Sequence, residues 1–108
     1  MEERRRYQRI YAQKHANGYD YGLELDGYYY KAKLVDVSQG GARLQLEDEP
    51  GVDLYEKSGV VKDDYYDQPY IEGVNYTVVW AKNYELGISF STPLDLEYGT
   101  LYLYYGNA

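Results

Sequence analysis

The sequence predicts an all-β domain: a small antiparallel barrel of six or seven strands that carries a basic N-terminal arm. Several short segments alternate apolar with polar residues, and turn signals rich in glycine, asparagine and aspartate separate them. In addition, tyrosine, which favours strands, occurs 17 times in 108 residues, and no apolar stripe of helical period is evident. We therefore divide the chain into an arm, residues 1–14, and a barrel domain, residues 15–108.

The first half of the barrel domain contains three predicted strands. Residues 19–25 alternate aromatic or aliphatic side chains with polar or small ones, which is typical of a half-buried strand. Asp26-Gly27 is a hairpin signal that leads into a second strand over residues 28–37, both of whose faces are mixed. A polar turn at 36–41 separates this strand from residues 42–46, where the alternation is cleanest. We expect a hairpin with this polar turn at its tip.

The middle of the chain is less regular. Residues 52–61 have strand character that Ser58-Gly59 interrupts. The acidic stretch 62–69 is expected to be an exposed loop. Residues 70–81 form the longest β-rich run, and they are apolar on both faces, as in a central strand.

Two further strands are predicted near the C-terminus. Residues 86–90 alternate apolar side chains with Gly87 and Ser89, and glycine inside a strand indicates a bulge or the close approach of another group. In residues 96–105 leucines alternate with tyrosines, and Gly99 would weaken a helix. We therefore expect a final strand here rather than a helix.

Composition argues against several classes of function. The chain has no cysteine, which excludes disulfides and thiolate metal sites, and the aspartates of the acidic stretch do not have the spacing of a calcium loop, so no metal is expected. His15 is the only histidine, and no phosphate loop or hydrolase elbow is present, so an enzyme has little support. No apolar run reaches the roughly 18 residues of a membrane span, and no secretory leader is evident, which makes the cytoplasm the default location.

Charge is distributed unevenly along the chain. Residues 1–14 carry a net charge of +3, whereas residues 15–108 carry −10. An acidic body disfavours duplex nucleic acid, and the arm makes a weak membrane anchor, so we expect neither partner. A short anionic ligand at the arm is compatible with this distribution. Arms of this kind are often solvated tails, but Tyr7, Ile10 and Tyr11 give this one groups with which to dock on the barrel.

Two short motifs lie at the arm and at the polar turn. Residues 5–9 have the form R-x-x-x-R, and residues 36–41 have the form D-x-S-x-x-G. Each has a simpler interpretation by itself: the arginines can be solvated, and Asp36 and Ser38 can cap their own backbone in the turn. Both motifs in this order, followed by residues 41–44, 78–80 and 86–90, make the chain resemble the PilZ domain, the bacterial receptor module for cyclic di-GMP.

The resemblance implies a six-stranded barrel that binds the nucleotide on its outer surface near the start of the third strand, with the arginine segment over it. An arginine fork suits phosphates or the O6 and N7 acceptors of guanine, Asp36 can accept from guanine N1 and N2, and the glycines allow unusual dihedral angles and a close approach. The candidate ligand-binding residues are Arg5, Arg9, Asp36, Ser38, Gly40 and Gly41, with Arg4, Arg6, Tyr7 and Gln39 as accessory contacts.

The function that the resemblance implies is that of a cytoplasmic receptor without catalytic activity. Cyclic di-GMP would order the arm over the barrel and so alter contact with a downstream protein partner. The alternative is an adaptor with the same fold that binds a protein and no nucleotide.

Overall fold

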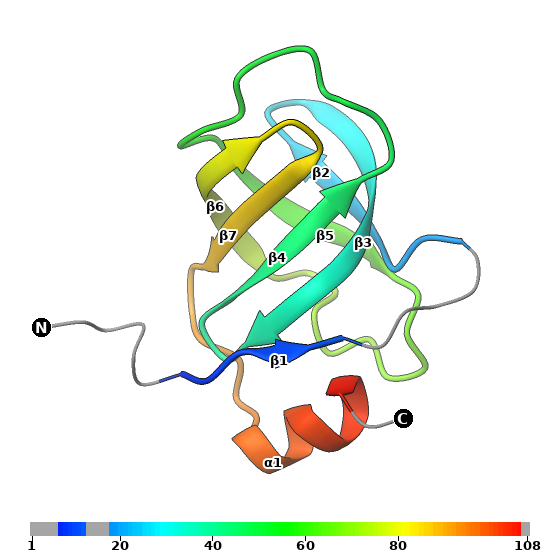
Figure 1. The fold of residues 1–108 in the computed structure, drawn as a ribbon, viewed down its shortest axis with the longest axis vertical. Coiled ribbons are helices and arrows are strands. Elements are labelled where there is room, and N and C mark those ends of the chain that lie inside the picture. Colours follow the sequence, from blue (N-terminus) through cyan, green and yellow to red (C-terminus); the bar gives the residue numbers. More distant parts are fainter. Residues whose placement is uncertain (1–6, 13–17, 107–108) are drawn as a thin grey trace, which may run out of the picture.

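A computed structural model of the chain describes residues 7–12 and 18–106 (Figure 1). Seven strands and a short helical tail follow one another along the sequence. The strands are β1 (Ile10–Tyr11), β2 (Tyr21–Leu25), β3 (Tyr28–Ser38), β4 (Gly41–Leu46), β5 (Ser58–Asp64), β6 (Asn75–Lys82) and β7 (Glu85–Phe90). The tail consists of the α-helical turn α1 (Tyr98–Leu101) and the π-helical turn η2 (Tyr102–Gly106).

Six of these strands close into an antiparallel barrel. The strand order runs β3-β2-β5-β6-β7-β4, and β4 pairs again with β3, so the sheet has no open edge between its first and last strands. The predicted fold class is confirmed. β1 is the additional strand: it pairs with the C-terminal part of β3, where Ile10 lies opposite Val37 and Tyr11 opposite Asp36. Ile10 is buried, so residues 10 and 11 of the arm are part of the sheet.

A β-bulge in β3 decides which way the polar turn motif faces. Leu34 pairs with Leu44 and Val37 with Ala42, on the inner face, whereas Asp36 pairs with Arg43 on the outer face. Uninterrupted alternation along the predicted strand 28–37 would put Leu34 and Asp36 on one face, and the structure differs. The register shift between Leu34 and Asp36 inserts one residue, which reverses the faces from that point on.

The strand β5 begins where the sequence suggested an interruption. Ser58 and Gly59 are its first residues, and residues 52–57 are not in a strand. Gly59 belongs there because β2 passes so close that a Cβ atom would lie 2.1 Å from the carbonyl oxygen of Glu24. The glycine is therefore a packing requirement of this strand pair and not a break in it.

The acidic stretch 62–69 is only partly a loop. Residues 62–64 complete β5, and Asp64 is buried. Its carboxylate accepts hydrogen bonds from the backbone N–H groups of Tyr66 and Ile71, both at 3.0 Å, and so ties the following loop to the barrel. Burial raises the pKa of Asp64, and the two backbone hydrogen bonds oppose that shift.

β6 is shorter than its predicted counterpart, and only one of its faces is apolar and covered. It begins at Asn75, shortly after a turn over residues 70–73, and Val79 is 48% exposed. Tyr76 and Val78 point into the core, but a register shift between Val78 and Trp80 places Trp80 opposite Gly87 on the outer face. The expectation of a strand buried on both faces was wrong because only the inner face of a small barrel is covered.

The C-terminal tail is helical, not a strand. Leu101 and Tyr105, four residues apart, are buried, whereas Leu103 is 67% exposed, as a helical turn requires and an alternating strand does not. The tail lies across one end of the barrel, below β1 in Figure 1. A Cβ atom on Gly106 would lie 2.6 Å from Cγ2 of Ile10, so η2 packs directly on β1.

Candidate ligand-binding site

The outer face of the barrel carries a row of four residues, one from each of four adjacent strands. Asp36 of β3 pairs with Arg43 of β4, Arg43 pairs with Gly87 of β7, and Gly87 pairs with Trp80 of β6. Because paired residues on adjacent strands project to the same face, the carboxylate, the guanidinium and the indole all lie on one surface, with the glycine between the last two. We call the hollow along this row the four-strand groove.

Two arginines surround the buried carboxylate of Asp36. The side chain of Asp36 is 3% exposed, and Arg43 Nε lies 3.1 Å from its Oδ2. Arg9 Nη1 lies 3.6 Å from the same oxygen, although the Arg9 side chain is 56% exposed. Arg9 therefore reaches Asp36 from the arm, through solvent-accessible space, whereas Arg43 approaches from the neighbouring strand.

Ser38 and Gly40 form a local turn. The backbone N–H of Gly40 donates to Ser38 Oγ at 3.3 Å, which is the backbone-capping role that the sequence left open for the serine. No such bond is made by Asp36 among the residues that the structure describes. The carbonyl groups of Gln39 and Gly40 accept from Leu94 and Phe90, at 2.7 and 2.9 Å. The turn is thus fixed from both sides, with Ser38 at the groove.

The two glycines of the motif are needed for space, not for unusual backbone angles. Neither Gly40 nor Gly41 is among the glycines with positive φ, which corrects the expectation of special dihedral angles. A Cβ atom on Gly41 would lie 2.2 Å from the carbonyl oxygen of Ile88, and one on Gly40 would lie 2.9 Å from Cδ2 of Tyr7. Gly41 therefore permits the close pairing of β4 with β7, and Gly40 receives the ring of Tyr7.

The groove brings the two sequence motifs together. It has a volume of about 330 Å³. The predicted residues that line it are Tyr7, Arg9, Asp36, Ser38, Gly40 and Gly41. Gln39 does not line it, and the Oε1 atom of its side chain is buried. Arg4, Arg5 and Arg6 lie outside the described residues.

Among the groove residues that the candidate list from the sequence did not include, three have side chains that can bond or stack with a ligand. Arg43, Trp80 and Ser89 line the groove, from β4, β6 and β7. The sequence contained indications of two of these residues. Arg43 lies on the polar face of the cleanest alternating strand, and Gly87 indicated a close approach, which the indole of Trp80 makes. A Cβ atom on Gly87 would lie 2.1 Å from Trp80 Nε1. The pairing of β4 with β7 and of β7 with β6, which joins these residues, was not predictable from either segment alone.

A model of the PilZ domain matches residues 3–104 of the chain, which include both motifs and all the strands of the barrel. The chain belongs to the PilZ domain family. No curated protein and no solved structure matches it. PilZ domains are in general binding or adaptor modules, and the family is one of receptors for cyclic di-GMP.

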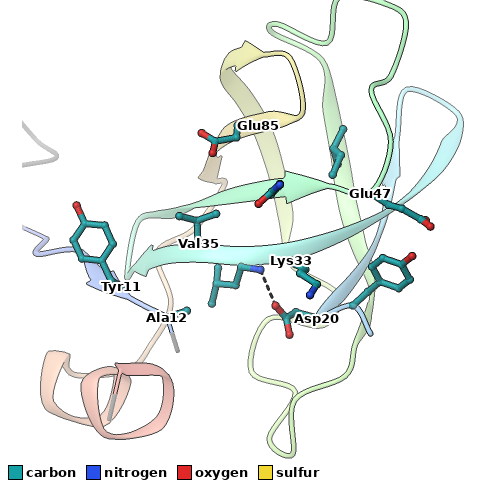
Figure 2. Close-up of a pocket in the computed structure, with 11 residues that line it drawn as sticks. Tyr11, Ala12, Asp20, Lys33, Val35, Glu47 and Glu85 are labelled. Atoms are coloured by element: carbon teal, nitrogen blue, oxygen red, sulfur yellow. Dashed lines mark hydrogen bonds between the residues drawn. The ribbon is translucent and has the colours of Figure 1, made fainter. Parts of the chain in front are cut away.

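A second, larger hollow of the PilZ barrel lies apart from the two motifs (Figure 2). It has a volume of about 700 Å³ and is lined by Asp20, Glu47 and Glu85, with Lys33 as the only cation among the described residues around it. The carboxylate of Asp20 accepts a 2.7 Å hydrogen bond from the backbone N–H of Leu34. Carboxylates repel a phosphate ligand, so size alone does not make this hollow the better anion site.

Residues 7–12 and 18–106 contain no group of three or more histidine, cysteine, aspartate or glutamate side chains placed to hold a metal ion. Within the same ranges, no helix has the length and apolar character needed to cross a membrane.

Proposed function

We propose that this PilZ domain binds cyclic di-GMP in the four-strand groove and that binding alters its contact with a protein partner in the cytoplasm. One observation carries the proposal: Arg9 of the R-x-x-x-R motif and Asp36 and Ser38 of the D-x-S-x-x-G motif line the same groove. These motifs are separated in the sequence but lie in one groove. Membership of the PilZ family suggests cyclic di-GMP as the ligand of that groove.

The arginines of the arm bind the phosphates of cyclic di-GMP. The ligand is a compact dianion, and the body of the domain is acidic, so cations must be supplied locally. Arg9 already reaches the groove, and its largely exposed side chain can turn from Asp36 to a phosphate. Arg5, four residues earlier on the arm, provides a second guanidinium in this proposal.

A guanine base of the ligand occupies the part of the groove between Asp36 and Trp80. Asp36 accepts from the N1 and N2 hydrogens of the base, and Ser38 can donate or accept beside it. The indole of Trp80 and the ring of Tyr7 border the same groove and offer faces on which a base can stack. The glycine between Arg43 and Trp80 lets the indole lie over β7 instead of being pushed away by a side chain.

The arm couples this site to the rest of the domain. Arg9 directly precedes β1, and β1 pairs with β3 on one side and packs against η2 on the other. A ligand that draws Arg9 away from Asp36 therefore changes the position of the arm next to the C-terminal tail. In this proposal, a partner protein recognises the repositioned arm.

Isothermal titration calorimetry with cyclic di-GMP tests the proposal. We expect a saturable signal for the unmodified domain and an affinity about 10- to 100-fold lower for Asp36→Asn, which removes a charged acceptor. Glu72→Gln makes the same chemical change at an exposed site and should bind as the unmodified domain does. Absence of binding at high micromolar ligand in low salt would refute the proposal.

The alternative function, a protein adaptor without a nucleotide, rests on the ion pair between Arg9 and Asp36, in which the two motifs satisfy each other's charge. Hydrogen exchange of residues 7–12 separates the two functions. If the domain is a receptor, the exchange protection of these backbone amides should change when cyclic di-GMP is added. If it is an adaptor, protection should change only when a protein partner is added.

A further inference from the structure

Arg43 lies in the groove, and the described part of the chain makes no use of the outer end of its guanidinium. Its Nε lies 3.1 Å from Asp36 Oδ2, and its side chain is 30% exposed. Within residues 7–12 and 18–106, no hydrogen bond or ion pair involves its Nη1 or Nη2 atoms. Gly87, its neighbour on β7, has no side chain that could cover these atoms.

Asp36 has a second carboxylate oxygen, Oδ1, beside that guanidinium. Its ion pairs with Arg9 and Arg43, the two that it makes within the described residues, both involve Oδ2. No hydrogen bond or ion pair of the described chain involves Oδ1. The groove therefore holds a carboxylate acceptor and the donors of an arginine fork next to each other, in one row, on adjacent strands.

This pair of groups complements two adjoining edges of guanine. The Hoogsteen edge has the acceptors N7 and O6, and the Watson–Crick edge, which shares O6, continues with the donors N1–H and the N2 amino group. Adenine has an amino donor where guanine has O6, and an acceptor at N1 where guanine has a donor. The arginine would therefore face a donor and the aspartate would face an acceptor. Each such mismatch leaves a charged group unpaired, which disfavours the wrong base.

The charge of the pair also favours a base over a phosphate at this point. Arg43 and Asp36 neutralise each other, and a phosphate beside Arg43 would meet the carboxylate of Asp36 at close range. Arg9 differs, because its side chain is 56% exposed and extends from the arm. An exposed cation on an arm suits a phosphate, whereas a cation fixed on the barrel next to a carboxylate suits a neutral edge with both donors and acceptors.

We propose that Arg43 is a specificity-determining residue that binds O6 and N7 of a guanine, while the adjacent Asp36 accepts from N1 and N2 of the same base. The inference rests on the proposed function and extends it to a residue outside both motifs. It assigns base recognition to the Asp36–Arg43 pair and phosphate binding to the arm.

A cycle of one protein change and one ligand change tests this assignment. The ligands are cyclic di-GMP and its 7-deaza analogue, in which N7 is replaced by carbon, and the variant is Arg43→Lys, which keeps a cation beside Asp36 and loses the fork. The unmodified domain should bind the analogue about tenfold more weakly, the scale of a lost bidentate contact. In Arg43→Lys this penalty should fall to about twofold or less.

Arg9→Lys is the matched control, because it makes the same chemical change on the arm. It should retain the full penalty for the 7-deaza analogue whatever its own affinity for cyclic di-GMP. Circular dichroism establishes that each variant is folded. Equal penalties in the unmodified domain and in Arg43→Lys would overturn the inference and leave the proposed function intact, whereas no binding of cyclic di-GMP by the unmodified domain refutes the proposed function itself.

Discussion

At the scale of single residues, glycine shapes the groove in two different ways. Gly41 is required by a neighbouring backbone, since a Cβ atom would lie 2.2 Å from the carbonyl oxygen of Ile88. Gly87 is required by a side chain, since the indole of Trp80 lies over it. The sequence marked both positions, but only the pairing of strands reveals which neighbour excludes a side chain.

Gly41→Ala should destabilise the domain by about 1–3 kcal/mol, because a backbone carbonyl cannot move aside as a flexible side chain can. Gly99→Ala is the control: it lies in α1 with open space around its Cα, and a gain of about 0.5–1 kcal/mol is expected from helix propensity. Urea denaturation measures both changes. A Gly41→Ala domain as stable as the unmodified one would contradict the close pairing of β4 with β7.

At the scale of elements, the C-terminal tail shows where local patterns mislead. Leu101 and Leu103 alternate with tyrosines as strand residues do, yet one leucine is fully buried and the other is 67% exposed. The buried partner of Leu101 is Tyr105, whose ring packs edge-on to Tyr66 at 5.0 Å between ring centroids. The tail becomes helical because a helical turn places both residues against the barrel.

Two leucine variants distinguish a helical tail from a strand. Leu101→Ala should lower the free energy of unfolding by about 2–5 kcal/mol, because it leaves a cavity at a fully buried position. Leu103→Ala should change it by less than about 0.5 kcal/mol, because that side chain is in solvent. Thermal or urea unfolding measures the two values. Similar losses for both leucines would indicate that they share a buried face, as in a strand.

At the scale of the whole molecule, the tyrosine-rich composition makes the core sensitive to alkali. Burial raises the pKa of Tyr21, Tyr66, Tyr76 and Tyr105 above the ordinary value. Three of these rings belong to one cluster at the tail, with Tyr21 and Tyr66 5.7 Å apart between ring centroids. Tyr76 is separate, and its hydroxyl donates to the carbonyl of Glu24 at 3.3 Å.

Stability should therefore fall as the pH rises above about 10, where tyrosines of the unfolded chain begin to ionise. In that range the unfolded state binds fewer protons than the folded state, so each buried tyrosine lowers the free energy of unfolding by up to about 1.4 kcal/mol per pH unit, until its folded-state pKa is reached. Urea unfolding at increasing pH measures the slope.

Tyr76→Phe provides the control for this alkaline effect. It removes one titrating hydroxyl, so the slope above pH 10 should become shallower by up to about 1.4 kcal/mol per pH unit. At neutral pH the same variant loses only the hydrogen bond to Glu24, worth about 1 kcal/mol. An unchanged slope would show that Tyr76 ionises alike in the folded and unfolded states.

The sequence by itself determined the elements whose physical cause is local. Period-2 alternation and turn residues located β2, β3, β4 and β7 to within two residues, because each strand of a barrel covers the core with every second side chain. The two motifs made Asp36, Ser38 and Arg9 candidate ligand-binding residues by residue type and order, and all three line the groove. These properties belong to short segments and are readable without knowing what lies beside them.

Tertiary structure decided which face of a strand each side chain occupies and which distant segments become neighbours. Bulges in β3 and β6 moved Asp36 and Trp80 to the outer face, which uninterrupted alternation does not predict. The pairing of β3, β4, β7 and β6 then aligned them with Arg43 in one row. A one-residue shift reverses every face that follows it, and only closure of the barrel fixes where such shifts occur. The groove is for this reason a property of the closed barrel rather than of either motif.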